Sequence, residues 1–226
     1  MTDPIVVVGG GGHAKVVLDV LQVQGWRVAG YTDSRAAAGD RIGEVSCLGT
    51  DDVLPELRAA GVCRAIVALG DNELRDRVAT EVVALGFALG NAVHPSAQIS
   101  RSAVLGQGVA VMAGTVVNAD SVIGDNAVIN TCASVDHDCR IGRSVHIAPG
   151  AHLAGYVIVE DLALIGVGST IGRGRPLRLG ERSVVGVGSV VIHDVAPGAL
   201  VVGNPARPLR ASAPSRTTGK NRRWTR

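Results

Sequence analysis

The carboxy-terminal half of this chain repeats every six residues. From Val93 to Ile171 every sixth residue is Val, Ile or Leu. The phase slips by two residues within 173–178, and the six-residue period resumes at Leu179. The positions are Val93, Ile99, Leu105, Val111, Val117, Ile123, Ile129, Val135, Ile141, Ile147, Leu153, Val159, Ile165, Ile171, Leu179, Val185 and Val191. The residue four places after each is small or slim, except Arg175 beside the slip. This six-residue period predicts a hexapeptide-repeat β-helix, in which burying each aliphatic side chain contributes roughly 1.5–3 kcal/mol to the stability of the fold.

The amino-terminal part has a different pattern, in which strands and helices alternate. A short apolar run at 5–8 predicts a buried strand, and four glycines at 9–12 lead into an amphipathic helix over 13–24. Further strands are expected at 27–31 and 64–69, with helices near 51–60 and from about 72 to 85. Alternating units of this length predict an α/β, Rossmann-like domain with a parallel sheet.

Composition narrows the class of protein. The chain has only five aromatic residues among 46% hydrophobic ones, which favours a tightly coiled β structure over a sandwich. The body of the chain has no basic stripe with interleaved aromatics, so nucleic acid is not an expected partner. No apolar run approaches membrane-spanning length, and no membrane association is expected. The four cysteines lack a framework spacing, which predicts reduced thiols in a cytoplasmic protein.

Three segments of this sequence resemble the sugar acyltransferases related to PglD, PerB and NeuD. They are VVVGGGGHAKVV near the start, INTCASVDHDCRIGRSVHIAPGAHLAG in the middle and VVGNPARPL near the end. The resemblance implies a nucleotide-sugar-binding domain at 1–90, a left-handed parallel β-helix at 91–209 with 18 residues per coil, and leaves 210–226 as a basic, disordered tail. It also implies a homotrimer that binds acetyl-CoA between subunits and acetylates a nucleotide-linked amino sugar.

The same resemblance assigns roles to particular residues. His137 is the expected general base with Asp138 as its partner, and His146 is expected near the thioester. The residues expected to bind acetyl-CoA are His146, Gly155, Gly166 and Gly186. The residues expected to bind the nucleotide sugar are Gly10, Gly11, Gly12, His13, Asp33 and Asn72. No metal is expected.

Chemistry supports the assignment of His137. It lies outside the inward positions of its hexad, and an imidazole with an ordinary pKa near ~6.5 is suited to accept the proton of an attacking amine. Asp138 would fix the tautomer of the ring, with Asp136 as the weaker candidate. Gly155 follows His137 by one 18-residue coil, so its backbone N–H is a candidate donor to the oxyanion.

The glycine loop allows two interpretations. Gly9-x-Gly11-x-x-Ala14 after a strand, with Asp33 at the end of the next strand, is a dinucleotide fingerprint. It would suit NAD, but the domain has only about half the size of a full dinucleotide fold. A nucleotide-sugar site, with phosphates on backbone N–H groups at the helix N-terminus, fits the short domain better.

Three other functions stay open on sequence grounds. An O-acetyltransferase acting on a sialic acid or another sugar hydroxyl would use the same histidine. A zinc hydratase of the γ-carbonic-anhydrase type shares the β-helix, but His146 and His152 are six residues apart and should diverge onto successive sides. A non-catalytic nucleotide sensor or scaffold would have no use for the His137–Asp138 pair.

Overall fold

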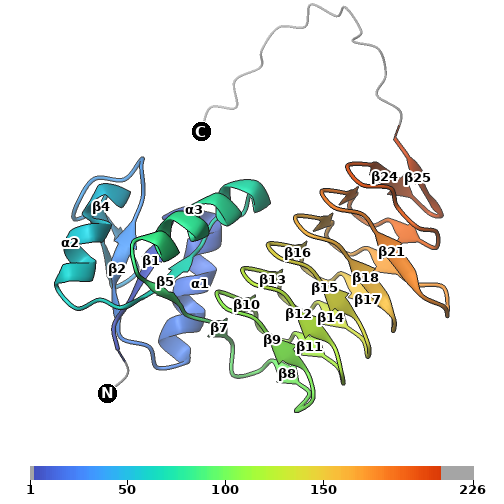
Figure 1. The fold of residues 1–226 in the computed structure, drawn as a ribbon, viewed down its shortest axis with the longest axis horizontal. Coiled ribbons are helices and arrows are strands. Elements are labelled where there is room, and N and C mark those ends of the chain that lie inside the picture. The colour runs from blue at the N-terminus through green and yellow to red at the C-terminus, as the bar shows by residue number, and fades with distance from the viewer. Residues whose placement is uncertain (1–2, 210–226) are drawn as a thin grey trace, which may run out of the picture.

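The computed structural model describes residues 3–209 and shows an α/β domain packed beside one end of a long β-helix (Figure 1). The predicted basic tail at 210–226 lies outside the described residues. Within 3–209, no helix has the length and apolar character needed to cross a membrane.

The amino-terminal domain is a parallel sheet with helices on its faces, as predicted. Its strands are β1 (Ile5–Val8), β2 (Val28–Thr32), β3 (Arg41–Ile42), β4 (Val45–Gly49), β5 (Arg64–Val67) and β6 (Ala88–Leu89). Its helices are α1 (Gly12–Val23), the 3₁₀ turn η1 (Asp51–Val53), α2 (Leu54–Ala59) and α3 (Asn72–Ala84). The strand order is β3-β4-β2-β1-β5-β6, and only β3 and β4 pair antiparallel among the pairs in this sheet of the described chain. That hairpin was not predicted from the sequence.

From residue 92 the chain winds into a left-handed parallel β-helix with three faces. The first face is β7 (Ala92–Val93), β10 (Ala110–Val111), β13 (Val128–Ile129), β16 (His146–Ile147), β19 (Leu164–Ile165), β22 (Val184–Val185), β24 (Leu200–Gly203) and β25 (Ala206–Pro208). The second is β8 (Gln98–Ile99), β11 (Val116–Val117), β14 (Ser134–Val135), β17 (His152–Leu153), β20 (Thr170–Ile171) and β23 (Val190–Val191). The third is β9 (Val104–Leu105), β12 (Val122–Ile123), β15 (Arg140–Ile141), β18 (Val157–Val159) and β21 (Leu177–Leu179).

Register between coils follows the predicted 18-residue period. Ile129 pairs with Ile147, which pairs in turn with Ile165, and all three side chains are fully buried. The six-residue positions therefore form columns of stacked aliphatics inside the prism. At many corners one turn residue has a positive φ, as at Asp120, Asp138 and Tyr156, which turns the chain onto the next face.

The α/β domain docks on the first face. Helix α1 packs over it, and the outward side chains of Ala110, Met112 and Val128 join the core of the amino-terminal domain. On the other side of this junction, α3 inserts Arg75, whose side chain is 1% exposed. This packing fixes which side of the prism the domain covers and leaves the other two faces free.

Arg75 bonds to stacked backbone carbonyls of the β-helix. Its Nε donates to Asn126 O at 2.9 Å and its Nη2 to Ser144 O at 2.7 Å, two turn residues one coil apart. Asn72 binds the corresponding turn of the following coil, where its Nδ2 donates to Leu162 O at 3.0 Å. Helix α3 thus holds three successive coils at one corner.

Replacing Arg75 by methionine should lower the free energy of unfolding by about 2–4 kcal/mol, because the buried carbonyls lose their donors while the volume is roughly kept. Arg77→Met on the same helix is the matched control, since Arg77 is exposed and makes only a 3.9 Å pair with Glu81; its effect should stay within ~0.5 kcal/mol. Urea titration of both variants measures the difference. Equal values would show that the buried guanidinium does not hold the junction.

Candidate functional site

The histidine–carboxylate pair lies in the turn between β14 and β15, at the corner between the second and third faces. His137 Nδ1 is 2.8 Å from Asp138 Oδ2, and the His137 backbone N–H donates to Asp136 Oδ1 at 2.8 Å. The side chains of His137 and Asp138 are 47% and 42% exposed. The pair therefore points outward, as its place in the hexad predicts.

Asp138 orients the imidazole. Because an ionised carboxylate only accepts hydrogen bonds, Nδ1 of His137 carries the proton and Nε2 keeps its lone pair. The hydrogen bond to Asp138 raises the pKa of His137 above its usual 6.5. Burial opposes this shift as the second-largest effect, and the charges of Asp136 and Asp138 each add a smaller upward contribution. Asp138 has a φ of +58°, a left-handed turn conformation that Asp and Asn tolerate better than other side chains.

Gly155 lies directly above the imidazole, one coil further along the prism. A Cβ at Gly155 would come within 2.6 Å of His137 Cε1 and 2.7 Å of Nε2, so only glycine leaves room for the ring. Within the described residues, the Gly155 N–H has no hydrogen-bond acceptor. An unpaired donor beside Nε2 suits the predicted oxyanion role.

Tyr156 completes this corner and was missed by the sequence analysis. Its ring stands edge-on to the His137 ring, with centroids 5.1 Å apart and planes at 89°, and its backbone N–H donates to His137 O at 3.1 Å. The 18-residue period, which places Tyr156 above Asp138, is the signal that would have found it.

The predicted glycine loop joins β1 to α1. Asp33, just after β2, accepts the Gly10 N–H on Oδ2 at 2.8 Å and the Arg35 N–H on Oδ1 at 2.7 Å. The Arg35 hydrogen bond holds the pKa of Asp33 below its usual value, with a further contribution from Gly10. A Cβ at Gly10 would be 2.7 Å from the Tyr31 ring, so glycine is required for this close approach.

Space for a ligand lies on both sides of this loop. A Cβ placed at Gly11 or Gly12, where α1 begins, would meet nothing within 4 Å. The open helix N-terminus is suited to bind phosphate. A cavity of about 310 Å³ adjoins it, lined in part by Gly9, Asp33 and Arg35.

His13 and His146 meet where the two domains join. Their ring centroids are 6.1 Å apart, and His146 Nε2 is 3.1 Å from Asn130 Nδ2. The pKa of each histidine is lowered to about 4, chiefly by burial; the positive charge of Arg75 contributes to both shifts, and His146 contributes to that of His13. Both rings are therefore neutral near pH 7, and His13 Nε2 is buried without a hydrogen-bond partner in the described structure.

Three other predicted residues have clear structural duties. The side chain of Asn72 binds the β-helix: its amide donates to Leu162 O and Ala163 O at 3.0 Å, and its Oδ1 accepts from Arg75. A Cβ at Gly166 would lie 2.5 Å from Val185 O, and one at Gly186 would lie 2.6 Å from Val202 Cγ1. Close stacking of coils accounts for both glycines, and their role in binding acetyl-CoA stays a prediction.

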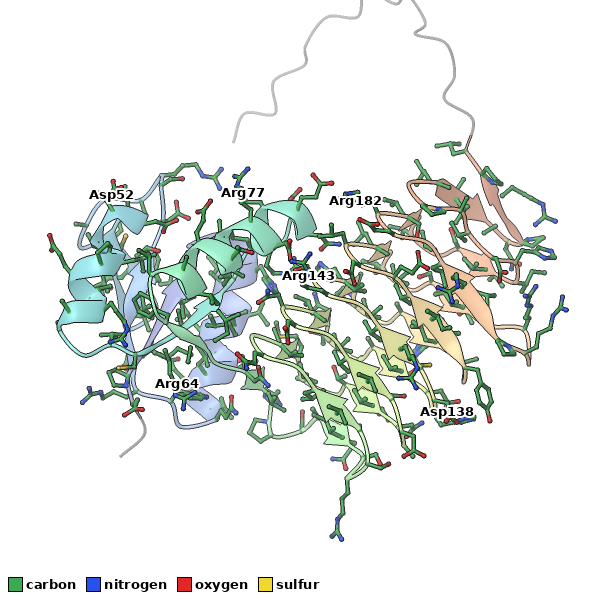
Figure 2. All side chains as sticks on the ribbon, viewed as in Figure 1. Asp52, Arg64, Arg77, Asp138, Arg143 and Arg182 are labelled. Carbon is green, nitrogen blue, oxygen red and sulfur yellow. The ribbon has the colours of Figure 1, made fainter. Side chains whose placement is uncertain are left out.

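The structure separates the predicted residues into two groups. His13, which follows the glycine loop, meets His146 at the junction between the amino-terminal domain and the first face, whereas His137 and Gly155 lie at the corner opposite that face. Figure 2 shows Asp138 on the side of the prism that the domain does not cover. One copy of the chain therefore does not bring the nucleotide loop and the imidazole together.

The histidines of the β-helix do not form a metal site. His146 is on the first face and His152 on the second, where its Nδ1 lies 2.8 Å from Ser134 Oγ. The divergence expected from their six-residue spacing is confirmed. Among residues 3–209, no group of three His, Cys, Asp or Glu side chains is placed to hold a metal ion.

Comparison with known proteins finds the PglD N-terminal domain family over residues 4–82. Among solved structures, PerB from Caulobacter crescentus in complex with CoA and GDP-perosamine is 45% identical, with a TM-score of 0.87 over 92% of this chain and 98% of PerB. The acetyltransferase domain of PglB from Neisseria gonorrhoeae FA1090 in complex with acetyl coenzyme A is 35% identical, with a TM-score of 0.85 over 92% of this chain and all of that domain.

Curated relatives match a shorter segment. The 2,3,4,5-tetrahydropyridine-2,6-dicarboxylate N-acetyltransferase of Staphylococcus aureus strain Newman is 38% identical over 64 residues, which is 28% of this chain and 26% of the relative. The chain spans between 14% and 26% of the length of the first curated relatives that it matches.

Replacing Asp138 by asparagine should lower the pKa of His137 toward 6.5, because the largest cause of the upward shift is the hydrogen bond to the carboxylate. Asn tolerates the left-handed φ, so the turn should persist. Asp120→Asn is the control, since Asp120 has the same turn position one coil below, with φ +60°. NMR titration of the His137 Cε1–H signal measures both, and an unchanged pKa in Asp138→Asn would contradict the assigned hydrogen bond.

Proposed function

This chain belongs to the PglD/PerB family of sugar N-acetyltransferases, and we propose that it transfers an acetyl group from acetyl-CoA to the amino group of a nucleotide-linked amino sugar. The observation that carries the proposal is the outward His137–Asp138 pair beneath the free N–H of Gly155. The free thiols of all four cysteines fit a reaction in the cytoplasm. Its product would supply the synthesis of a glycan.

The chemistry needs one base and one oxyanion donor. As the sugar nitrogen attacks the thioester carbonyl, a C–N bond forms and the C–S bond breaks. His137 Nε2 accepts the proton released from nitrogen and returns a proton to the departing thiolate. The Gly155 N–H donates to the oxygen that gains negative charge during the attack. Asp138 stabilises the imidazolium that forms in between.

The nucleotide is assigned to the glycine loop. Phosphates would bind the N–H groups of Gly11 and Gly12 at the start of α1, and Asp33 is placed to accept ribose hydroxyls. The base would enter the cavity beside Asp33 and Arg35. GDP is the nucleotide in the PerB complex, so GDP-linked amino sugars are the first to test.

The separation of the two groups of residues supports a homotrimer. The glycine loop and His137 lie on opposite sides of the prism, so a sugar held by one copy can reach only the imidazole of a neighbouring copy. A closed cyclic arrangement repeats that contact three times. His13 and His146 of one copy would then face the His137 corner of the next.

Replacing His137 by alanine should lower kcat by about 10²–10⁴-fold, the usual contribution of a general base. Mass spectrometry of acetyl-CoA reactions with GDP-, UDP- and dTDP-linked amino sugars measures this and identifies the acceptor. His152→Ala, an exposed histidine on the adjoining face, should stay within a few-fold of the parent.

The pH profile provides the stricter test. The neutral form of His137 is the active one, so kcat/KM should rise with pH through an apparent pKa above 6.5, and Asp138→Asn should move that limb to lower pH. An Ala variant with parental activity and an unchanged profile would remove His137 from the role.

Subunit mixing tests the composite site. His137→Ala and Asp33→Ala homotrimers should each be nearly inactive, but unfolding and refolding them together should restore activity, because some interfaces then pair an intact glycine loop with an intact imidazole. If a single chain held the whole site, every chain in the mixture would carry a lesion and no activity would return. Mixing two preparations of the same variant is the control.

A further inference from the structure

The corner that carries His137 continues upward into an enlarged turn. Its turns stack at 18-residue intervals, so that Ala154–Tyr156 lie above His137 and residues 172–176 lie one coil higher. The lower of these turns has three residues between β17 and β18, whereas the higher one has five between β20 and β21. The two extra residues at the slip in the sequence therefore form an enlarged loop in the same stack of turns as the candidate active site.

Polar contacts hold this loop in place from within. The guanidinium of Arg173 donates to Pro176 O at 3.2 Å and pairs with Asp194 Oδ1 at 3.3 Å, and the same Asp194 oxygen accepts the Arg178 backbone N–H at 3.1 Å. Gly174 supplies a φ of +69° at the bend. The loop is thus built around Asp194 and presents its central residues to solvent.

Of the three arginines in and beside this loop, one has no ion-pair partner within residues 3–209. Arg173 is paired with Asp194, and Arg178 is paired with Glu160 at 2.5 Å. Arg175, at the exposed tip of the loop, has no ion-pair partner among the described residues. A free guanidinium at this point would attract an anion.

The charged side chains on the turns above and below His137 determine the direction in which a phosphorylated ligand would lie. Asp136 and Asp138 flank the imidazole, and Asp120 occupies the turn below it, between the imidazole and Arg101 of the next turn down. The turn above has Gly155 and Tyr156 and no charged side chain. Carboxylates repel phosphates, so a ligand whose reactive end meets Nε2 and the Gly155 N–H would extend its anionic end upward.

Resting on the proposed function, we propose that the 172–176 loop is a phosphate subsite for CoA in which Arg175 binds the diphosphate or 3′-phosphate. Two coils at about 4.8 Å each put the loop roughly 10 Å above His137. The roughly 14 bonds of the pantetheine arm reach about 16 Å when extended, at the bond spacing of an extended chain. The arm therefore spans the distance, and guanidinium is the side chain best suited to a phosphate.

Calorimetry on the full-length protein tests the subsite without relying on turnover. Arg175→Ala should weaken CoA binding about 10–100-fold, the loss expected for a charge-assisted hydrogen bond. Arg175→Lys should recover part of it. If Arg175→Ala weakens the binding of both CoA and dephospho-CoA, Arg175 binds the diphosphate. If it weakens the binding of CoA alone, Arg175 binds the 3′-phosphate. Either result supports the subsite.

Arg101→Ala is the matched control. Arg101 is an exposed arginine in the same stack of turns. It lies two coils below His137, whereas Arg175 lies two coils above His137. This variant should bind CoA like the parent. Parental CoA affinity in Arg175→Ala, or a loss in Arg101→Ala instead, would overturn the assignment.

Acetyl-pantetheine separates this subsite from the function on which it rests. This donor lacks the phosphates, so Arg175→Ala should use it with a kcat/KM within two-fold of the parent. If the parent transfers acetyl from neither donor to any sugar nucleotide, the proposed function fails. If transfer from acetyl-CoA proceeds and Arg175→Ala leaves its KM unchanged, only the phosphate subsite fails.

Discussion

The buried guanidinium of Arg75 fixes the relation between the two domains, and the arrangement of the candidate site depends on it. Its donors meet the carbonyls of Asn126 and Ser144, and Asn72 continues the series at Leu162. Burial lowers the pKa of Arg75 to about 10, while Asp71 and Asp76 oppose the shift, so the group stays charged at neutral pH. A charged fork bound to carbonyls of successive coils tolerates little rotation or sliding of α3 along the prism.

The 18-residue coil converts spacing in the sequence into vertical neighbours in space. His137, Gly155 and the 172–176 loop are far apart along the chain, yet the parallel register stacks them on one corner. An outward side chain costs the β-helix little, because only the inward column of aliphatics must be preserved. The corners can therefore carry chemistry while the interior, as at Ile147, remains a plain stack of branched side chains.

The sequence predicted the β-helix closely because every inward position obeys one rule. It also placed His137 outside the core and Gly155 above it by counting alone. It missed the β3–β4 hairpin, whose strands are short and flank Gly43 without clear alternation. It also missed Arg75, because an arginine within a polar helix is normally solvated, and only the docking of α3 on the β-helix buries it. The duty of Asn72 at the junction was hidden for the same reason.

Burial is the main cause that separates the pKa values of the histidines, and the charge of Arg75 adds to it. Together they keep His13 and His146 neutral, with a pKa of about 4 each, whereas the carboxylates beside His137 raise its pKa above 6.5. When different environments shift the pKa values of titratable groups apart, the group whose pKa lies nearest the working pH carries the proton transfer. Of these three imidazoles only His137 can exchange a proton usefully near neutral pH. If neighbouring copies bring the two groups together, the neutral pair would supply polar contacts without competing for the proton, and the same guanidinium that holds the domains would help to keep the base unique.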